Sequence, residues 1–161
     1  MTREPLETGS TIDGFRIGEK IHTGGMATLW RVTHAGIDAP IVMKVPTILD
    51  GEDATVIVGF EMEMMILPRL SGVHVPKCYA VGDFARQPYV VMEYIKGQSA
   101  YALIDRAPLP PEEVVSLGAK VSTALVDLHR QHVLHLDIKS TWGPASVYFT
   151  MASRMVRRSK G

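Results

Sequence analysis

Two short segments in the first half of the chain carry groups suited to holding a phosphate. Gly24 and Gly25 lie between two apolar stretches, and glycines in such a turn let backbone N–H groups approach phosphate oxygens. Lys44 stands inside the apolar stretch 41–45, where a lysine either snorkels from an edge or points into a cleft to hold phosphate. A phosphate-binding lysine needs a carboxylate to position it, and Glu63 can supply one. The structural alternatives are a plain hairpin and a surface lysine.

The first half of the chain predicts strands and one helix. Short apolar or alternating stretches bounded by turn residues predict five strands. They are Phe15–Ile21, Leu29–His34, Ile41–Val45, Cys78–Val81 and Tyr89–Glu93. Between the third and fourth strands, apolar residues recur at helical spacing within Asp53–Leu70. Pro68 fits poorly inside that helix and is expected to kink it near its end.

The second half predicts helix. Five apolar residues recur with the period of one buried helix face. They are Val114, Leu117, Val121, Leu125 and Leu128. The helix is followed by His135-Leu136-Asp137-Ile138-Lys139, which taken alone predicts a polar turn with a surface aspartate and lysine. The fold class is therefore α+β, with a five-stranded antiparallel sheet and one helix, followed by a helical part.

The composition excludes several classes of protein. The chain has 161 residues with 17 basic and 17 acidic side chains, so the overall charge gives no case for a nucleic acid or a membrane surface as partner. The apolar stretches are too short to span a bilayer, and the N-terminus has no pattern of a secretory signal. Cys78 is the only cysteine, which excludes an intrachain disulfide and a Cys-based zinc site. We expect a cytoplasmic protein.

In this order and spacing, the segments resemble a protein kinase, and most closely the eukaryotic-like serine/threonine kinases of bacteria. The resemblance covers roughly residues 12–139. Five segments carry it. They are Gly24-Gly25-Met26-Ala27, Ile41-Val42-Met43-Lys44, the helix segment around Glu63, the hinge-like Tyr89-Val90-Val91-Met92-Glu93-Tyr94-Ile95, and Leu125 to Lys139, which is similar to the helix that leads into the catalytic loop.

The resemblance implies an ATP site. Lys44 would contact the α- and β-phosphates and be held by Glu63. The glycine-rich turn would cover the phosphates, and its residues are His22, Thr23, Gly24, Gly25, Met26 and Ala27. The adenine would lie between apolar side chains and bind the hinge backbone behind a gatekeeper at Met92. The apolar residues are Ile21, Leu29 and Val42, and the hinge groups are the Glu93 carbonyl and the Ile95 N–H.

The resemblance also implies catalytic roles for two residues after the second helix. Asp137 would accept the proton of the substrate hydroxyl. Lys139 would meet the transferring phosphate, and its presence indicates serine/threonine rather than tyrosine specificity. Leu136 replaces the arginine that usually binds a phosphorylated activation loop, so that form of regulation would be absent.

The sequence departs from the family pattern after Lys139. Trp142 stands where the Mg²⁺-binding asparagine is expected, and a realignment that skips 140–143 places Ser146 there. The chain has no Asp-Phe-Gly, and no acidic residue follows Asp137. Because Mg²⁺ prefers carboxylate and phosphate oxygens, the metal site is incomplete. His22 is a smaller departure, since it replaces the first loop glycine.

The sequence therefore divides into four parts. Residues 1–11 form an N-terminal tail, 12–95 a kinase small lobe with its hinge, 96–139 the start of an incomplete large lobe, and 140–161 a divergent basic tail. The favoured function is a truncated, inactive serine/threonine kinase that still binds ATP. The alternative is a non-catalytic module that binds a partner, or a second copy, through its exposed apolar helix. The tail itself is either genuine or the product of an insertion or frameshift.

Overall fold

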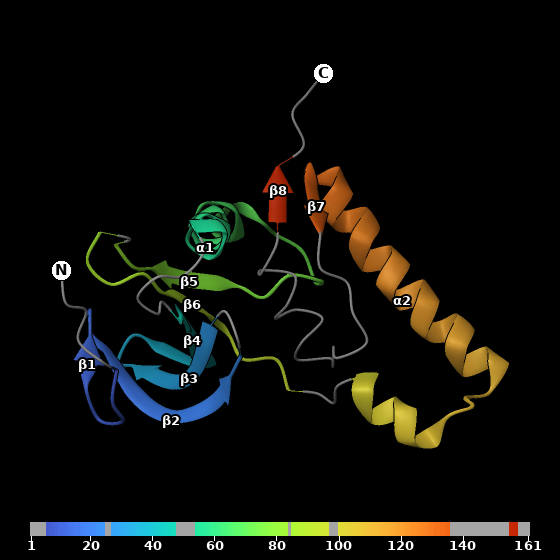
Figure 1. Ribbon diagram of the computed structural model, residues 1–161, viewed down its shortest axis with the longest axis horizontal. Helices are drawn as coiled ribbons and strands as arrows, with labels where there is room; N and C mark the ends of the chain where they lie inside the picture. The colour runs from blue at the N-terminus through green and yellow to red at the C-terminus, as the bar shows by residue number, and fades with distance from the viewer. Residues whose placement is uncertain are drawn as a thin grey trace.

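A curled antiparallel sheet of six strands forms the first half of the computed structural model (Figure 1). The structure describes residues 6–24, 27–47, 54–83, 85–96, 100–135 and 155–157. The sheet order is β1-β2-β3-β4-β6-β5, and every neighbouring pair is antiparallel. The strands are β1 Thr11–Ile12, β2 Phe15–Thr23, β3 Ala27–His34, β4 Ile37–Pro46, β5 Cys78–Val81 and β6 Val90–Glu93. All five predicted strands are present.

Two details of the sheet differ from the sequence prediction. The sixth strand, β1, has two residues, too few to show an alternating pattern, and a turn with positive φ at Asp13 and Gly14 joins it to β2. Strand β4 begins at Ile37 rather than Ile41, because His34 already pairs with Ile37 across a two-residue turn. Pro40 lies within this strand, where its carbonyl accepts a hydrogen bond from the Tyr94 N–H at 2.9 Å.

Helix α1 (Ala54–Ile66) packs on one face of the sheet. The α-helix ends two residues before Pro68, and Leu67–Arg69 continues as a 3-10 turn, η1. Proline lacks the N–H that an interior helical turn requires. The α-helix therefore ends before Pro68, where the sequence predicts a kink. The buried apolar cluster under α1 combines helix and strand residues. It includes Phe60, Met64, Ile66, Leu67, Leu29, Val42, Val90 and Met92.

A second buried cluster lies on the opposite face of the strands. Ile41 and Met43 belong to it, whereas Val42 between them belongs to the cluster under α1. Because successive side chains of a strand point to opposite faces, this assignment shows that β4 is apolar on both sides. The other members of the second cluster are Phe15, Ile17, Trp30, Val32, Val45, Tyr89 and Val91.

Helix α2 (Pro111–Arg130) extends away from the sheet and touches the rest of the protein near its ends (Figure 1). It follows a 3-10 segment, η2 (Ala100–Arg106), to which the ion pair Arg106–Glu113 joins it at 2.9 Å. After α2, strand β7 (Val133–His135) pairs with β8 (Met155–Arg157) in a separate antiparallel ladder. No helix among the described residues is both long and apolar enough to cross a membrane.

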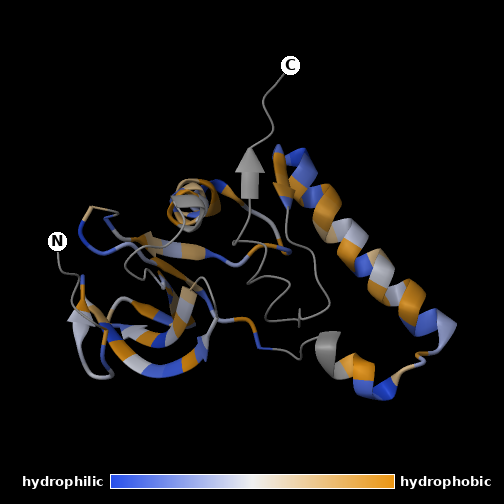
Figure 2. Ribbon diagram, in the orientation of Figure 1, coloured by the Kyte–Doolittle hydropathy of each residue, from blue (hydrophilic) through white to orange (hydrophobic). Residues whose placement is uncertain are grey.

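The predicted apolar face of α2 is buried only towards its C-terminal end. Ala124 and Leu128 are buried, whereas Val114 and Leu117 have exposed fractions of 53% and 36%. Figure 2 shows apolar residues recurring along the whole helix. Burial of a large apolar side chain stabilises a protein by roughly 1.5–3 kcal/mol, and each exposed side chain lacks that contribution. Exposed apolar residues that lie together mark interaction surfaces.

We therefore predict that the isolated chain self-associates at micromolar concentration. Changing Val114 and Leu117 together to lysine should shift the sedimentation profile towards monomer and leave the melting temperature nearly unchanged, since both side chains are already exposed. Val126→Lys is the matched control, because Val126 is 45% exposed but lies on another side of the same helix. A wild-type chain that sediments as a monodisperse monomer with one cooperative thermal transition would contradict this prediction.

Candidate functional site

The structure joins Lys44 of β4 to Glu63 of α1 in a buried ion pair. Lys44 Nζ lies 2.8 Å from Glu63 Oε1 and 2.7 Å from Oε2, so both carboxylate oxygens are bound. The exposed fractions of the two residues are 4% and 1%. Burial raises the pKa of Glu63 to about 7, and the neighbouring Lys44 charge acts in the opposite direction. The carboxylate that the sequence required for Lys44 is therefore in place.

The position of Glu63 follows from the spacing of α1. Phe60, Met64 and Leu67 are all buried towards the sheet, and residues three or four apart share one side of a helix. Glu63 lies between them on that side and is the one charged residue among them, so it meets the lysine that β4 presents. The Lys44 ammonium also lies 5.8 Å from the centre of the Phe60 ring, a cation–π distance.

The residues expected to surround the adenine share this face of the sheet. Val42 lies two positions before Lys44 and therefore points to the same side, and it is paired in register with Met92 of β6. Leu29 of β3 is paired with Lys44. Leu29, Val42 and Met92 belong to one buried cluster, and Ile21 packs against it. The structure thus brings the three predicted adenine contacts and the predicted gatekeeper together beside the ion pair.

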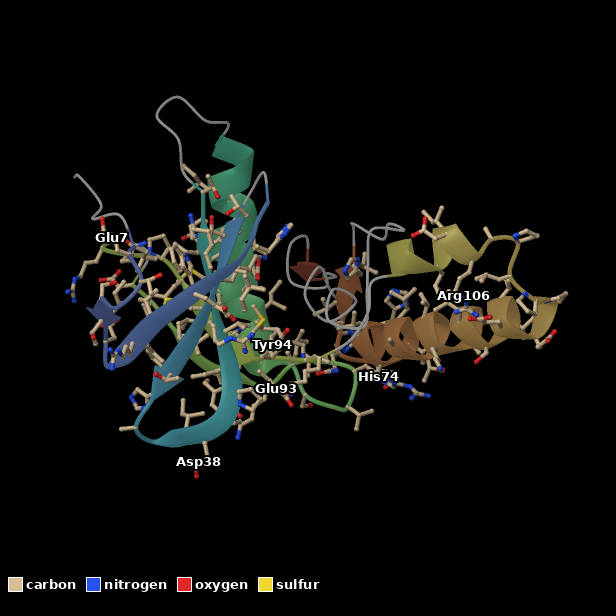
Figure 3. The ribbon with its side chains drawn as sticks, turned by 90° about the horizontal axis from the view of Figure 1, so that it is seen from below. Glu7, Asp38, His74, Glu93, Tyr94 and Arg106 are labelled. Carbon is tan, nitrogen blue, oxygen red and sulfur yellow. The ribbon has the colours of Figure 1, made fainter. Side chains whose placement is uncertain are left out.

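The expected hinge segment, Tyr89 to Ile95, includes β6 and the residues that follow it. The Glu93 N–H donates to the Lys77 carbonyl at 2.9 Å, and the guanidinium of Arg31 lies 4.8 Å from the centre of the Tyr94 ring. Figure 3 shows Glu93 and Tyr94 where the chain leaves the sheet. Ile95 is half-buried in this connection. These contacts fix the backbone of the segment between the sheet and the helical part.

The glycine turn joins β2 to β3, and a hydrogen bond from the Gly24 N–H to the Ala27 carbonyl at 2.9 Å closes it. Thr23 ends β2, while Gly25 and Met26 lie outside the described residues. His22 is exposed and paired in register with Leu29. A Cβ built on Gly24 would meet His22 Nε2 at 3.5 Å, so the imidazole lies against this turn. The ladder therefore accommodates histidine in place of the usual glycine.

The predicted catalytic residues lie outside the described part of the chain. Strand β7 ends at His135, which is buried, two residues before Asp137. Asp137 and Lys139, like Leu136, Trp142 and Ser146, are not among the described residues. Their roles remain predictions from the sequence.

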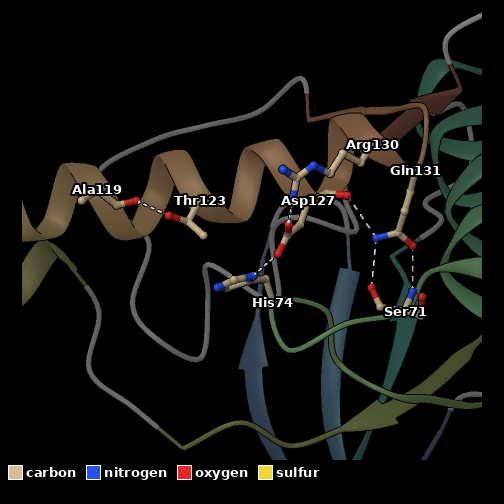
Figure 4. Close-up of polar contacts among 7 residues, drawn as sticks. All are labelled: Ser71, His74, Ala119, Thr123, Asp127, Arg130 and Gln131. Atoms are coloured by element: carbon tan, nitrogen blue, oxygen red, sulfur yellow. Dashed lines mark hydrogen bonds and ion pairs between the residues drawn. The ribbon is translucent and has the colours of Figure 1, made fainter.

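A polar network that the sequence does not predict joins the loop 70–77 to the end of α2 (Figure 4). Its members are Ser71, His74, Asp127, Arg130 and Gln131. The two sides are separated by 53 to 60 residues in the chain. Single polar residues in a loop and at a helix end carry no pattern from which such a pairing could be predicted.

Comparison with known proteins identifies the family. The sequence model of the protein kinase domain family matches residues 15–141. The chain therefore belongs to this family. It is 32% identical to the serine/threonine-protein kinase PknL of Mycobacterium tuberculosis over 86% of this chain and 35% of PknL. It is 30% identical to the serine/threonine-protein kinase PknF of the same species, over 84% of this chain and 29% of PknF.

A solved kinase domain has the same fold as this chain. The kinase domain of Mycobacterium tuberculosis PknI superimposes with a TM-score of 0.70 and 26% identity, covering 85% of this chain and 56% of that chain. The predicted kinase small lobe is thereby confirmed. The chain spans about a third of the length of the curated relatives and just over half of the solved domain.

The raised pKa of Glu63 leads to a pH prediction. The pKa rises from 4.5 to about 7 in the folded state, so the folded protein binds more protons than the unfolded chain between these values. Stability contributed by this group is therefore lost as the pH rises through that window. Urea unfolding of wild type and Glu63→Gln should show the free energy of unfolding of wild type falling, relative to the variant, from pH 4.5 to 7. A difference that stays constant or grows with pH would show that burial does not raise the pKa of Glu63 against the Lys44 charge.

Proposed function

We propose that this chain binds ATP on the sheet face that carries Val42 and Lys44, and that these 161 residues bind the nucleotide without transferring its γ-phosphate. The observation that supports binding most strongly is the Lys44–Glu63 ion pair. Two charges removed from water are costly unless each is well paired, so a lysine and carboxylate enclosed in an apolar cluster are typical of a functional site. In protein kinases such a pair holds the α- and β-phosphates.

The remaining contacts support the same assignment. Ile21, Leu29 and Val42 offer apolar surface for the adenine next to the ion pair. The backbone that follows Met92, from Glu93 to Ile95, offers the hydrogen-bonding groups of a hinge. The relatives PknL and PknF are serine/threonine protein kinases, and Lys139 favours the same acceptor class here. A complete kinase built on this segment would accordingly phosphorylate serine or threonine residues of a protein.

The metal site argues for binding rather than transfer. Phosphoryl transfer in kinases depends on Mg²⁺ ions held by an aspartate and an asparagine. Trp142 occupies the position expected for the asparagine, and no acidic residue follows Asp137 in the sequence. The residues present do not fit the metal, and Asp137 and Lys139 would therefore lack the charge stabilisation on which the reaction depends.

We expect the loss of Lys44 to weaken binding of ATP more than binding of adenosine, because the lysine would contact only phosphates. Charge-assisted hydrogen bonds contribute roughly 1.5–3 kcal/mol, so the loss for ATP should be about 10- to 150-fold. The variant to measure by calorimetry is Lys44→Met with Glu63→Gln, which leaves no unpaired buried charge. Lys20→Ala is the control, since Lys20 is exposed and lies over Trp30 on β3. Equal losses for ATP and adenosine would contradict the role of Lys44.

We also expect no appreciable phosphotransferase activity. With radiolabelled ATP, Mg²⁺ and a generic protein substrate, wild type and Asp137→Asn should give the same background signal. Transfer by wild type that disappears in Asp137→Asn would show that the chain assembles a working metal site after all.

A second candidate function is a non-catalytic interaction module. The exposed apolar residues in the first half of α2, Val114 and Leu117, favour it. The two functions are separable, because the module requires the α2 surface and not Lys44. A chain that binds neither ATP nor adenosine, but self-associates through α2, would favour the module.

A further inference from the structure

A polar clamp joins the loop that follows α1 to the end of α2 (Figure 4). The side-chain amide of Gln131 accepts a hydrogen bond from the Ser71 N–H at 2.9 Å through Oε1 and donates to the Ser71 carbonyl at 2.9 Å through Nε2. Both backbone groups of Ser71 are thus bound by one side chain, as a neighbouring strand would bind them. Close by, His74 Nδ1 lies 2.6 Å from Asp127 Oδ2.

Asp127 is the centre of the clamp on the α2 side. Its carboxylate binds His74 through Oδ2 and accepts a hydrogen bond from Arg130 Nη1 at 3.3 Å through Oδ1. Its backbone carbonyl accepts a hydrogen bond from Gln131 Nε2 at 3.2 Å, which orients the amide that reaches Ser71. Asp127 and Gln131 therefore act on the loop together, from one turn of helix and its C-cap.

The clamp is mechanically connected to the Lys44–Glu63 pair. Glu63 lies in the last turn of α1, and η1 continues the chain from Leu67 without an intervening flexible linker. The Leu70 N–H donates to the Leu67 carbonyl at 3.2 Å, which leaves Ser71 as the next residue. Beneath the clamp, Leu67 and Val75 share one buried apolar cluster with Leu128. A displacement of the loop would therefore move the end of α1 and, with it, Glu63.

We propose that Gln131 and Asp127 are positioning residues, which hold the loop 70–77 on α2 so that the Glu63 carboxylate stays oriented on Lys44. This inference rests on the proposed nucleotide binding for its functional consequence, because the lysine that Glu63 orients would be the phosphate ligand. Gln131 also lies six residues before Asp137, so the clamp ties the segment that carries the ion pair to the segment predicted to be catalytic.

The test compares Gln131→Ala and Asp127→Ala with wild type in the full chain. Each should weaken ATP binding by roughly 3- to 10-fold and leave adenosine binding unchanged, since a loop that is clamped for only a fraction of the time lowers apparent affinity by that fraction. Gln131→Glu keeps the acceptor for the Ser71 N–H but loses the donor, and should fall between wild type and Gln131→Ala. Thr123→Val is the matched control, because among the described residues Thr123 Oγ1 bonds within α2 alone, to the Ala119 carbonyl at 2.9 Å.

A second readout does not depend on nucleotide. Hydrogen exchange of the apo chain should become faster in α1 and in the loop 70–77 in Gln131→Ala and Asp127→Ala, and stay as in wild type in Thr123→Val. If wild type binds no ATP while this exchange pattern holds, nucleotide binding fails and the clamp stands. Unchanged exchange in α1, or equal losses of ATP and adenosine affinity in the clamp variants, would overturn the positioning role.

Discussion

The ion pair between Lys44 and Glu63 is the contact on which the arrangement of sheet and helix depends. It is buried in an apolar cluster, and both carboxylate oxygens are within 2.8 Å of the ammonium. A buried pair adds little net stability, because desolvation offsets its attraction, but leaving one partner alone is strongly unfavourable. The pair therefore restricts how α1 can pack on the sheet. Helix α1 can pack on the sheet only in the register that brings Glu63 to Lys44.

The apolar framework around the pair makes this requirement rigid. Strand β4 is buried on both faces, so a shift by one residue would exchange its two apolar sides and move Lys44 into the other cluster. Met92 and Leu29 hold the neighbouring strands in register with it. Beyond the C-terminal end of α1, hydrogen bonds between Ser71 and Gln131 join the following loop to α2. The candidate site is thus fixed from the sheet, from the helix and from the loop.

The sequence predicts most of this framework because short periods determine it. The apolar run 41–45 predicts β4, and helical spacing predicts α1 and α2. The need of a buried lysine for a carboxylate, together with the family resemblance, predicts the pairing of Lys44 with Glu63. Strand β1 escapes prediction, since two residues show no period. The contact between His74 and Asp127 escapes for another reason: it joins residues 53 apart in the chain through geometry that exists only after folding. The predicted roles of Asp137 and Lys139 still rest on family resemblance.

We propose that the buried pair orients Lys44 for nucleotide phosphate. A crystal structure of the chain with a non-hydrolysable ATP analogue tests it most directly. We expect Lys44 Nζ within hydrogen-bonding distance of an α- or β-phosphate oxygen while Glu63 remains bound to it, with the adenine between Leu29 and Val42. An analogue bound elsewhere, or one that lies in this site with Lys44 turned away from its phosphates, would show that the pair does not orient Lys44 for phosphate.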